Sequence, residues 1–251
     1  ATLTHFIQGS VTAPQASWQE GRRWTAEDTE KIHEEAVQTI ASRYGKKYTW
    51  ELKVKLMGTT GLNSARMVID GLNLPLTMGD YLADLGRIYA EKYPKVDLMP
   101  GVDRLVRHLH KHSIPMAIAT SSKRVAVTMK TANHKELFAL FHHVVCAGDN
   151  PEIKHGKPHP DIFLVAASQF DGKPPPAKVL VFEDAPNGVT AALAAGMQVV
   201  MLPDPRMDEK NKRRATMCVD SLRNFKPELF SLPPFKDAGK NSSPDDANSD
   251  L

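Results

Sequence analysis

The feature that most constrains the fold is an alternation of short apolar runs with helical stripes in the second half of the chain. Val102, Leu105, Val106 and Leu109 form one such stripe, with the spacing of a helix that packs one face on a sheet. Near-continuous apolar strands separated by helices are typical of parallel strands covered on both faces. The alternation therefore predicts an α/β fold with a doubly wound parallel sheet. The expected strands cover residues 114–120, 142–147, 178–183 and 198–202.

Residues 29–96 have a different pattern, with helical stripes and no convincing strand. The stripes are broken by Gly45, Gly58, Pro75 and Pro94. A helical block beside an α/β core predicts a small helical cap domain. The expected division is a truncated or replaced first core strand and loop at 1–27, the cap at 28–96, the α/β core at 97–235, and a disordered tail at 236–251, which has almost no apolar residues.

Composition excludes several classes of partner. The 251 residues carry 32 basic against 29 acidic side chains, and a net charge of +3 is too small to indicate nucleic acid or an anionic membrane as a partner. No apolar run approaches the ~20 residues of a membrane span, and the first ten residues lack the pattern of a secretory signal. Cys146 and Cys218 form neither a disulfide framework nor a zinc motif. We expect a cytoplasmic monomer.

Polar residues follow two of the predicted strands at the point where each ends. Thr120, Ser121 and Ser122 follow one, and their hydroxyl groups and backbone amides suit a phosphate group. Glu183 and Asp184 follow the other, at the turn into an alanine-rich helix. Ligands of an open α/β sheet bind outside the carboxyl ends of its strands, and paired carboxylates there suit Mg²⁺.

A single lysine, Lys157, lies in a proline-rich loop ahead of a predicted helix that begins at Ile162. Its ammonium group could neutralise a phosphate. Taken alone, a loop lysine is usually solvated, and a Thr-Ser-Ser sequence is usually a turn or a helix cap. The order of Thr120, Lys157 and Glu183-Asp184 along the chain is far more specific than any one of them.

With these residues in that order, the sequence resembles the haloacid-dehalogenase-like hydrolases. Within them it resembles the subgroup with a helical cap inserted after the first core strand, and most of all the pseudouridine-5'-phosphatase group. Thr120 matches the second family motif, Lys157 the third, and Glu183-Asp184 the fourth. The resemblance extends from about Asp28 to Pro234. It implies a Rossmann-like core and a phosphomonoester hydrolase that acts on a small phosphorylated metabolite, with pseudouridine 5'-phosphate as the leading candidate.

The resemblance also implies a mechanism. An aspartate attacks phosphorus, a second aspartate two positions later acts as acid and then base, and Mg²⁺ offsets repulsion between the anions. Thr120, Ser121 and Lys157 would bind the phosphate, and Asp184 with Glu183 would hold the metal. Two alternatives remain, a non-catalytic module that binds a phosphate or a partner, and a sugar-phosphate phosphatase or phosphomutase of the same superfamily.

Both catalytic aspartates of this family belong to a D-x-D-G motif at the end of the first core strand. Here that strand is expected at residues 3–7, but the chain has no aspartate before Asp28. Glu20 and Glu27 are the only acids in between, and neither follows a strand-like run. The sequence therefore lacks an equivalent for the nucleophile and for the general acid.

Three explanations for residues 8–27 stay open. The segment could be an artefact of gene prediction or splicing, a genuine isoform without chemistry, or an insertion with a compensating residue. We favour the first two, because loss of the end of a buried central strand is not a conservative change. Its composition is that of a loop.

Four further features have simpler interpretations. His108 and His112 share a helix face and could pair on a metal, but a polar helix face is the preferred interpretation. Asp161 and Asp204 are expected to cap or turn the chain. The basic run at residues 210–214 has no aromatic platform beside it and is expected to be a solvated surface loop.

Overall fold

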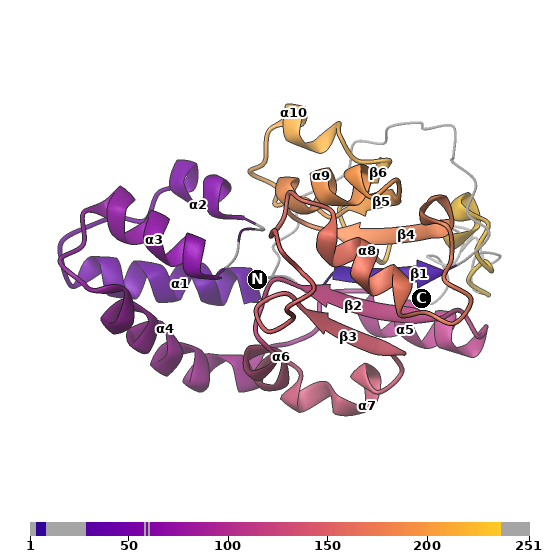
Figure 1. The fold of residues 1–251 in the computed structure, drawn as a ribbon, viewed down its shortest axis with the longest axis horizontal. Coiled ribbons are helices and arrows are strands. Elements are labelled where there is room, and N and C mark those ends of the chain that lie inside the picture. The colour runs from indigo at the N-terminus through magenta and orange to yellow at the C-terminus, as the bar shows by residue number, and fades with distance from the viewer. Residues whose placement is uncertain (1–3, 9–28, 58, 60, 237–251) are drawn as a thin grey trace, which may run out of the picture.

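The computed structural model describes residues 4–8, 29–57, 59 and 61–236 (Figure 1). The helical block contains α1 (Thr29–Ser42), α2 (Trp50–Leu56), α3 (Gly61–Leu72), α4 (Met78–Lys92) and the 3₁₀ turn η1 (Tyr93–Lys95). The core strands are β1 (Thr4–Gln8), β2 (Met116–Thr120), β3 (His143–Cys146), β4 (Val179–Glu183), β5 (Gln198–Met201) and β6 (Met217–Cys218). The core helices are α5 (Val102–Lys111), α6 (Arg124–Lys130), α7 (Lys135–Phe138), α8 (Asp161–Ser168), α9 (Pro186–Ala194) and α10 (Glu209–Lys212), with 3₁₀ turns η2 (Ala132–His134), η3 (Pro176–Lys178) and η4 (Pro227–Phe230).

Within the described residues, the strands form one six-stranded sheet in the order β3-β2-β1-β4-β5-β6. The pairs β2–β3, β4–β5 and β5–β6 are parallel, and β1 pairs antiparallel with both β2 and β4, so the carboxyl ends of the other five strands meet at one edge. The expected α/β fold class is therefore confirmed. Each of the four strands predicted in the second half of the chain lies within its expected range.

The first strand departs from the expected parallel arrangement. β1 occupies the central position but runs antiparallel to both neighbours, with Thr4 opposite Ala119 and Gln8 opposite Val179 (Figure 1). Its amino end, not its carboxyl end, therefore lies at the edge where β2 and β4 end. Hydropathy could not reveal this, because an apolar run satisfies a buried central position equally well in either direction.

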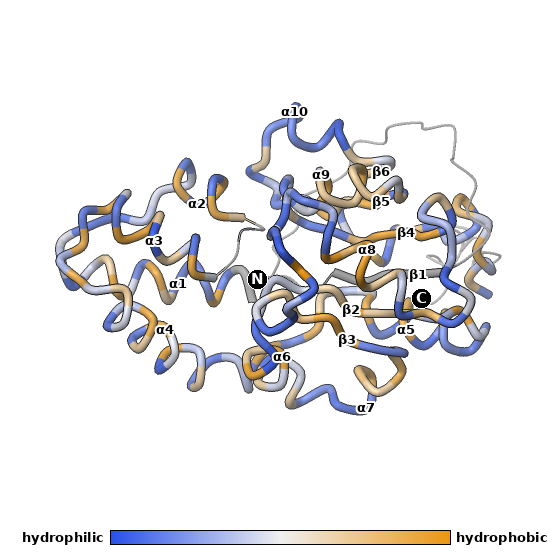
Figure 2. Tube along the Cα trace, viewed as in Figure 1, coloured by the Kyte–Doolittle hydropathy of each residue, from blue (hydrophilic) through white to orange (hydrophobic). Residues whose placement is uncertain are grey.

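Helices cover both faces of the sheet, as a doubly wound fold requires. One face packs on α8 and α9 through buried side chains that include Ala119, Val181 and Phe163. The other packs on α5, on α7 and on the segment of residues 222–235. Side chains alternate between the two faces along β2 and β4, and both strands are buried throughout. Figure 2 shows these strands as apolar and the exposed α10 as hydrophilic.

The helical block packs around its own core beside the sheet (Figure 1). Tyr81 of α4 and Ile40 of α1 are fully buried in it. Thr49 and Thr77 accept hydrogen bonds from Leu52 N and Asp80 N and so cap the starts of α2 and α4. We refer to this helical block as the cap, and its role as the cap domain expected at residues 28–96 stays a prediction. The disordered tail was predicted for residues 236–251, of which 237–251 lie outside the described residues.

Candidate active site at the carboxyl edge of the sheet

Thr120 and Asp184 lie at the same edge of the sheet, on strand ends separated by the width of β1. Thr120 ends β2 and is fully buried, and its hydroxyl oxygen accepts a hydrogen bond from Ser122 N at 3.2 Å. Ser121 between them is half-buried. Asp184 directly follows β4 and is buried. Strands two places apart lie about 10 Å from each other, and the amino end of β1 lies between these two strand ends.

The side chain of Lys157 extends from an exposed loop into the interior of the protein. It is buried, although its neighbours Pro158 and His159 are exposed. Its ammonium group donates to a carboxylate oxygen of Glu183, and the pair is nearly inaccessible to solvent. The same nitrogen lies 4.8 Å from the centroid of the buried Phe163 ring. The structure thus shows a buried lysine where a loop lysine would usually be solvated, and its expected role in phosphate binding stays a prediction.

Three hydrogen-bond donors contact the carboxylate of Glu183. One carboxylate oxygen accepts from Lys157, and the other accepts from Asp184 N at 3.1 Å and Ala185 N at 3.2 Å. Both oxygens therefore have donors from the chain itself. These three donors hold the Glu183 carboxylate in one position beside the Lys157 ammonium group.

Gly188 lies in the first turn of α9 and has no side chain, and the carboxyl group of Glu183 occupies the space where a side chain would lie. A Cβ atom at this position would lie 2.0 Å from the carboxyl carbon of Glu183. Sequence reasoning missed this residue. The available signal was a glycine inside an alanine-rich helix, which weakens a helix unless packing requires it.

Four charged residues, which we call the cap latch, join the cap to the core beside this edge. They are Glu34 of α1, Lys53 of α2, and Asp204 and Arg206 from the loop after β5. The guanidinium of Arg206 donates to Glu34 at 3.1 and 3.3 Å and to Asp204 at 2.9 and 3.0 Å. The buried Lys53 lies 2.6 Å from Glu34 and 3.8 Å from Asp204. The Arg206 guanidinium also stacks 4.3 Å from the Trp50 ring centroid.

Contacts within the cap latch change the pKa values of its own members. The hydrogen bond from Arg206 lowers the pKa of Glu34 to about 2, against the opposing effect of burial and with further help from Lys53. Burial raises the pKa of Asp204, but contacts with Arg206 lower it by more, so its net shift is downward. The two carboxylates in turn raise the pKa of Arg206. Asp204 also accepts from Arg206 N at 2.9 Å, which forms the turn expected for it.

A second contact joins cap and core directly at the site. Asn187, at the start of α9, donates its side-chain amide to the carbonyl oxygen of Met57 at 2.7 Å. Met57 follows α2 and is buried in the core cluster that includes α8 and α9. The cap therefore lies against the segment that begins with Asp184.

Asp161 organises the loop that carries Lys157. It begins α8, and one carboxylate oxygen accepts from Lys154 N at 3.0 Å and His155 N at 2.9 Å. Burial raises its pKa, but these hydrogen bonds and the nearby His159 lower it by more. It thus turns the chain, as expected.

The remaining sequence candidates take structural positions or lie outside the described residues. His108 contacts the carbonyl oxygen of Pro233 at 2.8 Å, and its ring packs 4.6 Å from that of Phe235. It fastens the C-terminal segment to α5. In the basic run, Lys212 pairs with Glu209 at 2.9 Å on the short helix α10. Glu20, Glu27 and Asp28 lie in the part of the chain that the structure does not describe.

Comparison with known proteins identifies the family. A family profile described as haloacid dehalogenase-like hydrolase matches residues 12–196. The chain therefore belongs to the haloacid dehalogenase-like hydrolase family. It is 47% identical to (DL)-glycerol-3-phosphatase 2 of Arabidopsis thaliana over 84% of this chain and 89% of that protein. It is 46% identical to the probable pseudouridine-5'-phosphatase of Drosophila melanogaster over 84% of this chain and 91% of that protein.

Solved structures support the same fold. The chain is similar to a β-phosphoglucomutase from Clostridium difficile, with a TM-score of 0.65 and 24% identity over 80% of this chain and 89% of that one. It is also similar to CbbY from Rhodobacter sphaeroides in complex with phosphate, with a TM-score of 0.62 and 23% identity over 78% and 89% of the two chains. By family resemblance the chain is a phosphatase. Within the described residues, every helix is too short or too polar to cross a membrane.

Proposed function

We propose that this edge of the sheet is the phosphate- and Mg²⁺-binding half of a phosphomonoester hydrolase site. The observation that carries the proposal is the buried Lys157–Glu183 pair beside Asp184. A buried pair costs desolvation energy that a well-packed apolar pair would avoid, so it is weak evidence for a stabilising role. A lysine held rigidly at the carboxyl edge of an α/β sheet is well placed to meet an anion.

The proposal gives each residue a separate role. The Thr120 hydroxyl and the Ser121 amide bind phosphate oxygens, and Lys157 neutralises charge on the phosphoryl group. Asp184 is the metal ligand, and its buried carboxylate suits a hard cation. Glu183 was expected to share that role; because its carboxylate accepts from Lys157, Asp184 N and Ala185 N, we assign it the positioning of Lys157. When bound, Mg²⁺ would offset the repulsion between carboxylate and phosphate.

We propose further that this chain binds phosphate without hydrolysing it. No aspartate precedes Asp28 in the sequence. The strand between β2 and β4, where the family places its nucleophile, presents its amino end to the site. Both observations favour a non-catalytic module as the second candidate function. The origin of residues 8–27 determines which candidate holds, and N-terminal peptides of the natural protein would establish whether it contains them.

The direct test is phosphate release from pseudouridine 5'-phosphate and glycerol 3-phosphate with Mg²⁺. We expect no release above background, together with calorimetric binding of inorganic phosphate that Lys157→Met weakens. Lys111→Met, at the exposed end of α5, is the matched control and should leave binding unchanged. Metal-dependent turnover that Asp184→Asn abolishes would show that the chain has a nucleophile after all.

A restored variant separates the substrate classes. Replacing residues 8–27 with a strand end that carries D-x-D-G, in a β1 that runs parallel to β2 and β4 so that the motif lies beside Thr120 and Asp184, should produce Mg²⁺-dependent release and should raise the melting temperature. A panel of nucleotide, glycerol and sugar phosphates then distinguishes the pseudouridine 5'-phosphate hypothesis from a sugar-phosphate phosphatase or phosphomutase. The named relatives favour pseudouridine 5'-phosphate and glycerol 3-phosphate as the first substrates to test. No release from a restored variant in which β1 runs parallel to its neighbours, so that the motif reaches the site, would contradict the roles assigned to Lys157 and Asp184.

A further inference from the structure

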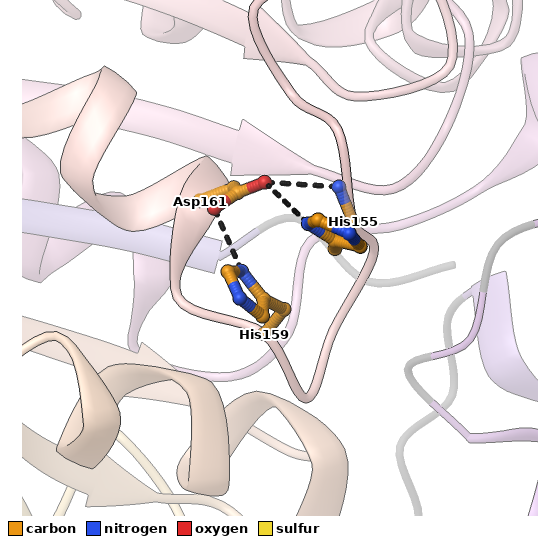
Figure 3. Close-up of side chains that lie close together, drawn as sticks. All are labelled: His155, His159 and Asp161. Atoms are coloured by element: carbon orange, nitrogen blue, oxygen red, sulfur yellow. Dashed lines mark hydrogen bonds and ion pairs between the residues drawn. The ribbon is translucent and has the colours of Figure 1, made fainter.

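The loop that carries Lys157 has a second, outward-facing set of polar side chains. Lys157 points inward to Glu183, whereas His155 and His159, two positions before and after it, are exposed. Figure 3 shows both imidazole rings beside the carboxylate of Asp161. This His155–His159–Asp161 cluster uses none of the residues assigned to the phosphate site.

The cluster brings three ligand groups to one point. One donor atom from each residue lies within 4.8 Å of the other two. Asp161 Oδ1 is 2.7 Å from His159 Nδ1, and Asp161 Oδ2 is 3.4 Å from His155 Nδ1. Ligand atoms around a tetrahedral zinc ion with bonds of about 2.0–2.1 Å lie about 3.3 Å apart. The observed separations therefore need only small side-chain rotations to reach a coordination sphere.

Backbone hydrogen bonds already hold the Asp161 carboxylate in place without a metal ion. Its Oδ2 atom accepts hydrogen bonds from the backbone amides of Lys154 and His155, and the Asp161 side chain is only 18% exposed. Ligating carboxylates are commonly oriented by hydrogen bonds of this kind. The two imidazole rings are 66% and 49% exposed, so they can rotate without disturbing the core.

The donor set selects the class of ion. Two imidazole nitrogens and one carboxylate oxygen suit zinc and similar transition-metal ions, and three protein ligands leave the fourth position for water. Mg²⁺ prefers oxygen ligands and keeps much of its water, so it is a poor competitor here. We propose that His155, His159 and Asp161 form a binding site for one zinc-type ion, separate from the Mg²⁺ position at Asp184.

The test is calorimetric titration of the untagged, chelator-treated chain with ZnCl₂ in the presence of excess MgCl₂. We expect one equivalent of zinc to bind, with affinity reduced about tenfold or more in His155→Gln and in His159→Gln. His110→Gln is the matched control, because His110 is also exposed and lies on α5, away from this loop in sequence. Equal affinity in the parent and both loop variants, or displacement by Mg²⁺, would overturn the proposal.

A second measurement needs no variant. Among the chain's 10 histidines, zinc should first shift the imidazole NMR resonances of His155 and His159. Substitution of Co²⁺ should give visible bands of a nitrogen- and oxygen-ligated ion, without the charge-transfer band of a thiolate ligand. A thiolate band would instead place the ion at Cys146 or Cys218 and would contradict the site.

Discussion

The position of Lys157 depends on a residue that has no side chain. Gly188 → Ala would place a methyl group 2.1 and 2.3 Å from the two carboxylate oxygens of Glu183. Because the carboxylate is buried and has donors on three sides, it cannot simply move into water. We expect a loss of about 1–3 kcal/mol in the free energy of unfolding. Urea denaturation measures it.

The matched control is Gly86→Ala, in the exposed face of α4, where an added Cβ meets nothing within 4 Å. Alanine stabilises a helix relative to glycine, so this variant should gain about 0.5–1 kcal/mol. Two glycine-to-alanine changes in helices are thus expected to have opposite signs. Equal stability of Gly188→Ala and the parent protein would contradict the close packing of Glu183 on α9.

The ion pair itself predicts a non-additive result. Glu183→Leu would leave the ammonium of Lys157 buried without its carboxylate, and such a break costs about 3–5 kcal/mol. Adding Lys157→Met to Glu183→Leu should recover most of that loss, because two apolar side chains of similar volume need no solvation. The double-mutant cycle in urea gives the coupling energy, and purely additive losses would show that the pair does not act as one unit.

At the level of elements, the direction of β1 determines what the central strand presents to the site. The antiparallel register places Thr4 opposite Ala119, and Met116 opposite Ile7. Paired Cα atoms in such a ladder lie about 4.5–5.5 Å apart, which a disulfide can span. We therefore expect the pair Thr4→Cys with Ala119→Cys to form a disulfide under mild oxidation. Mass spectrometry after proteolysis identifies it.

The control pair is Thr4→Cys with Met116→Cys, since Met116 lies three residue steps along β2 from Ala119, about 10 Å. A parallel β1 would reverse the outcome and favour this second pair. Both pairs should be built with Cys146 and Cys218 replaced, so that no other thiol competes. Exclusive formation of the second disulfide would show that β1 runs parallel and would return its carboxyl end to the site.

The same strand shows what sequence could and could not predict. Apolar runs located β2, β4 and β5 because a strand buried on both faces must be apolar throughout. They could not give the direction of β1, which depends on pairing with residues more than a hundred positions away. In the same way Thr120, Lys157 and Asp184 were predicted as site residues from their positions at strand ends or in a loop, and their roles stay predictions. The packing of Gly188 against Glu183 depends on side-chain geometry and was not predictable.

At the scale of the whole molecule, the cap latch determines how firmly the cap lies against the core. Its members come from positions 34, 53, 204 and 206, and no local pattern in the sequence connects them. The carboxyl group of Glu34 has a pKa of about 2 in the folded protein, against an ordinary value of 4.5. Because the pKa of Glu34 is lower in the folded protein than in the unfolded chain, the contribution of Glu34 to the free energy of unfolding is complete above pH 4.5. It decreases as the pH falls toward 2.

Glu34→Gln should therefore cost most stability near neutral pH and less at pH 3, because the contribution is lost as the pH falls from 4.5 through about 2. The Glu34 side chain is 36% exposed and solvent screens its contacts, so we expect only about 0.5–1 kcal/mol at pH 7. Urea denaturation of parent and variant at several values between pH 7 and pH 3 measures the difference, and carboxyl groups elsewhere cancel in the comparison. Glu152→Gln, an exposed glutamate in the loop before α8, is the control with no expected change. A difference that stays constant down to pH 3 would mean that Glu34 carries no charge-dependent contact, and that other contacts, such as Asn187 with Met57, hold the cap.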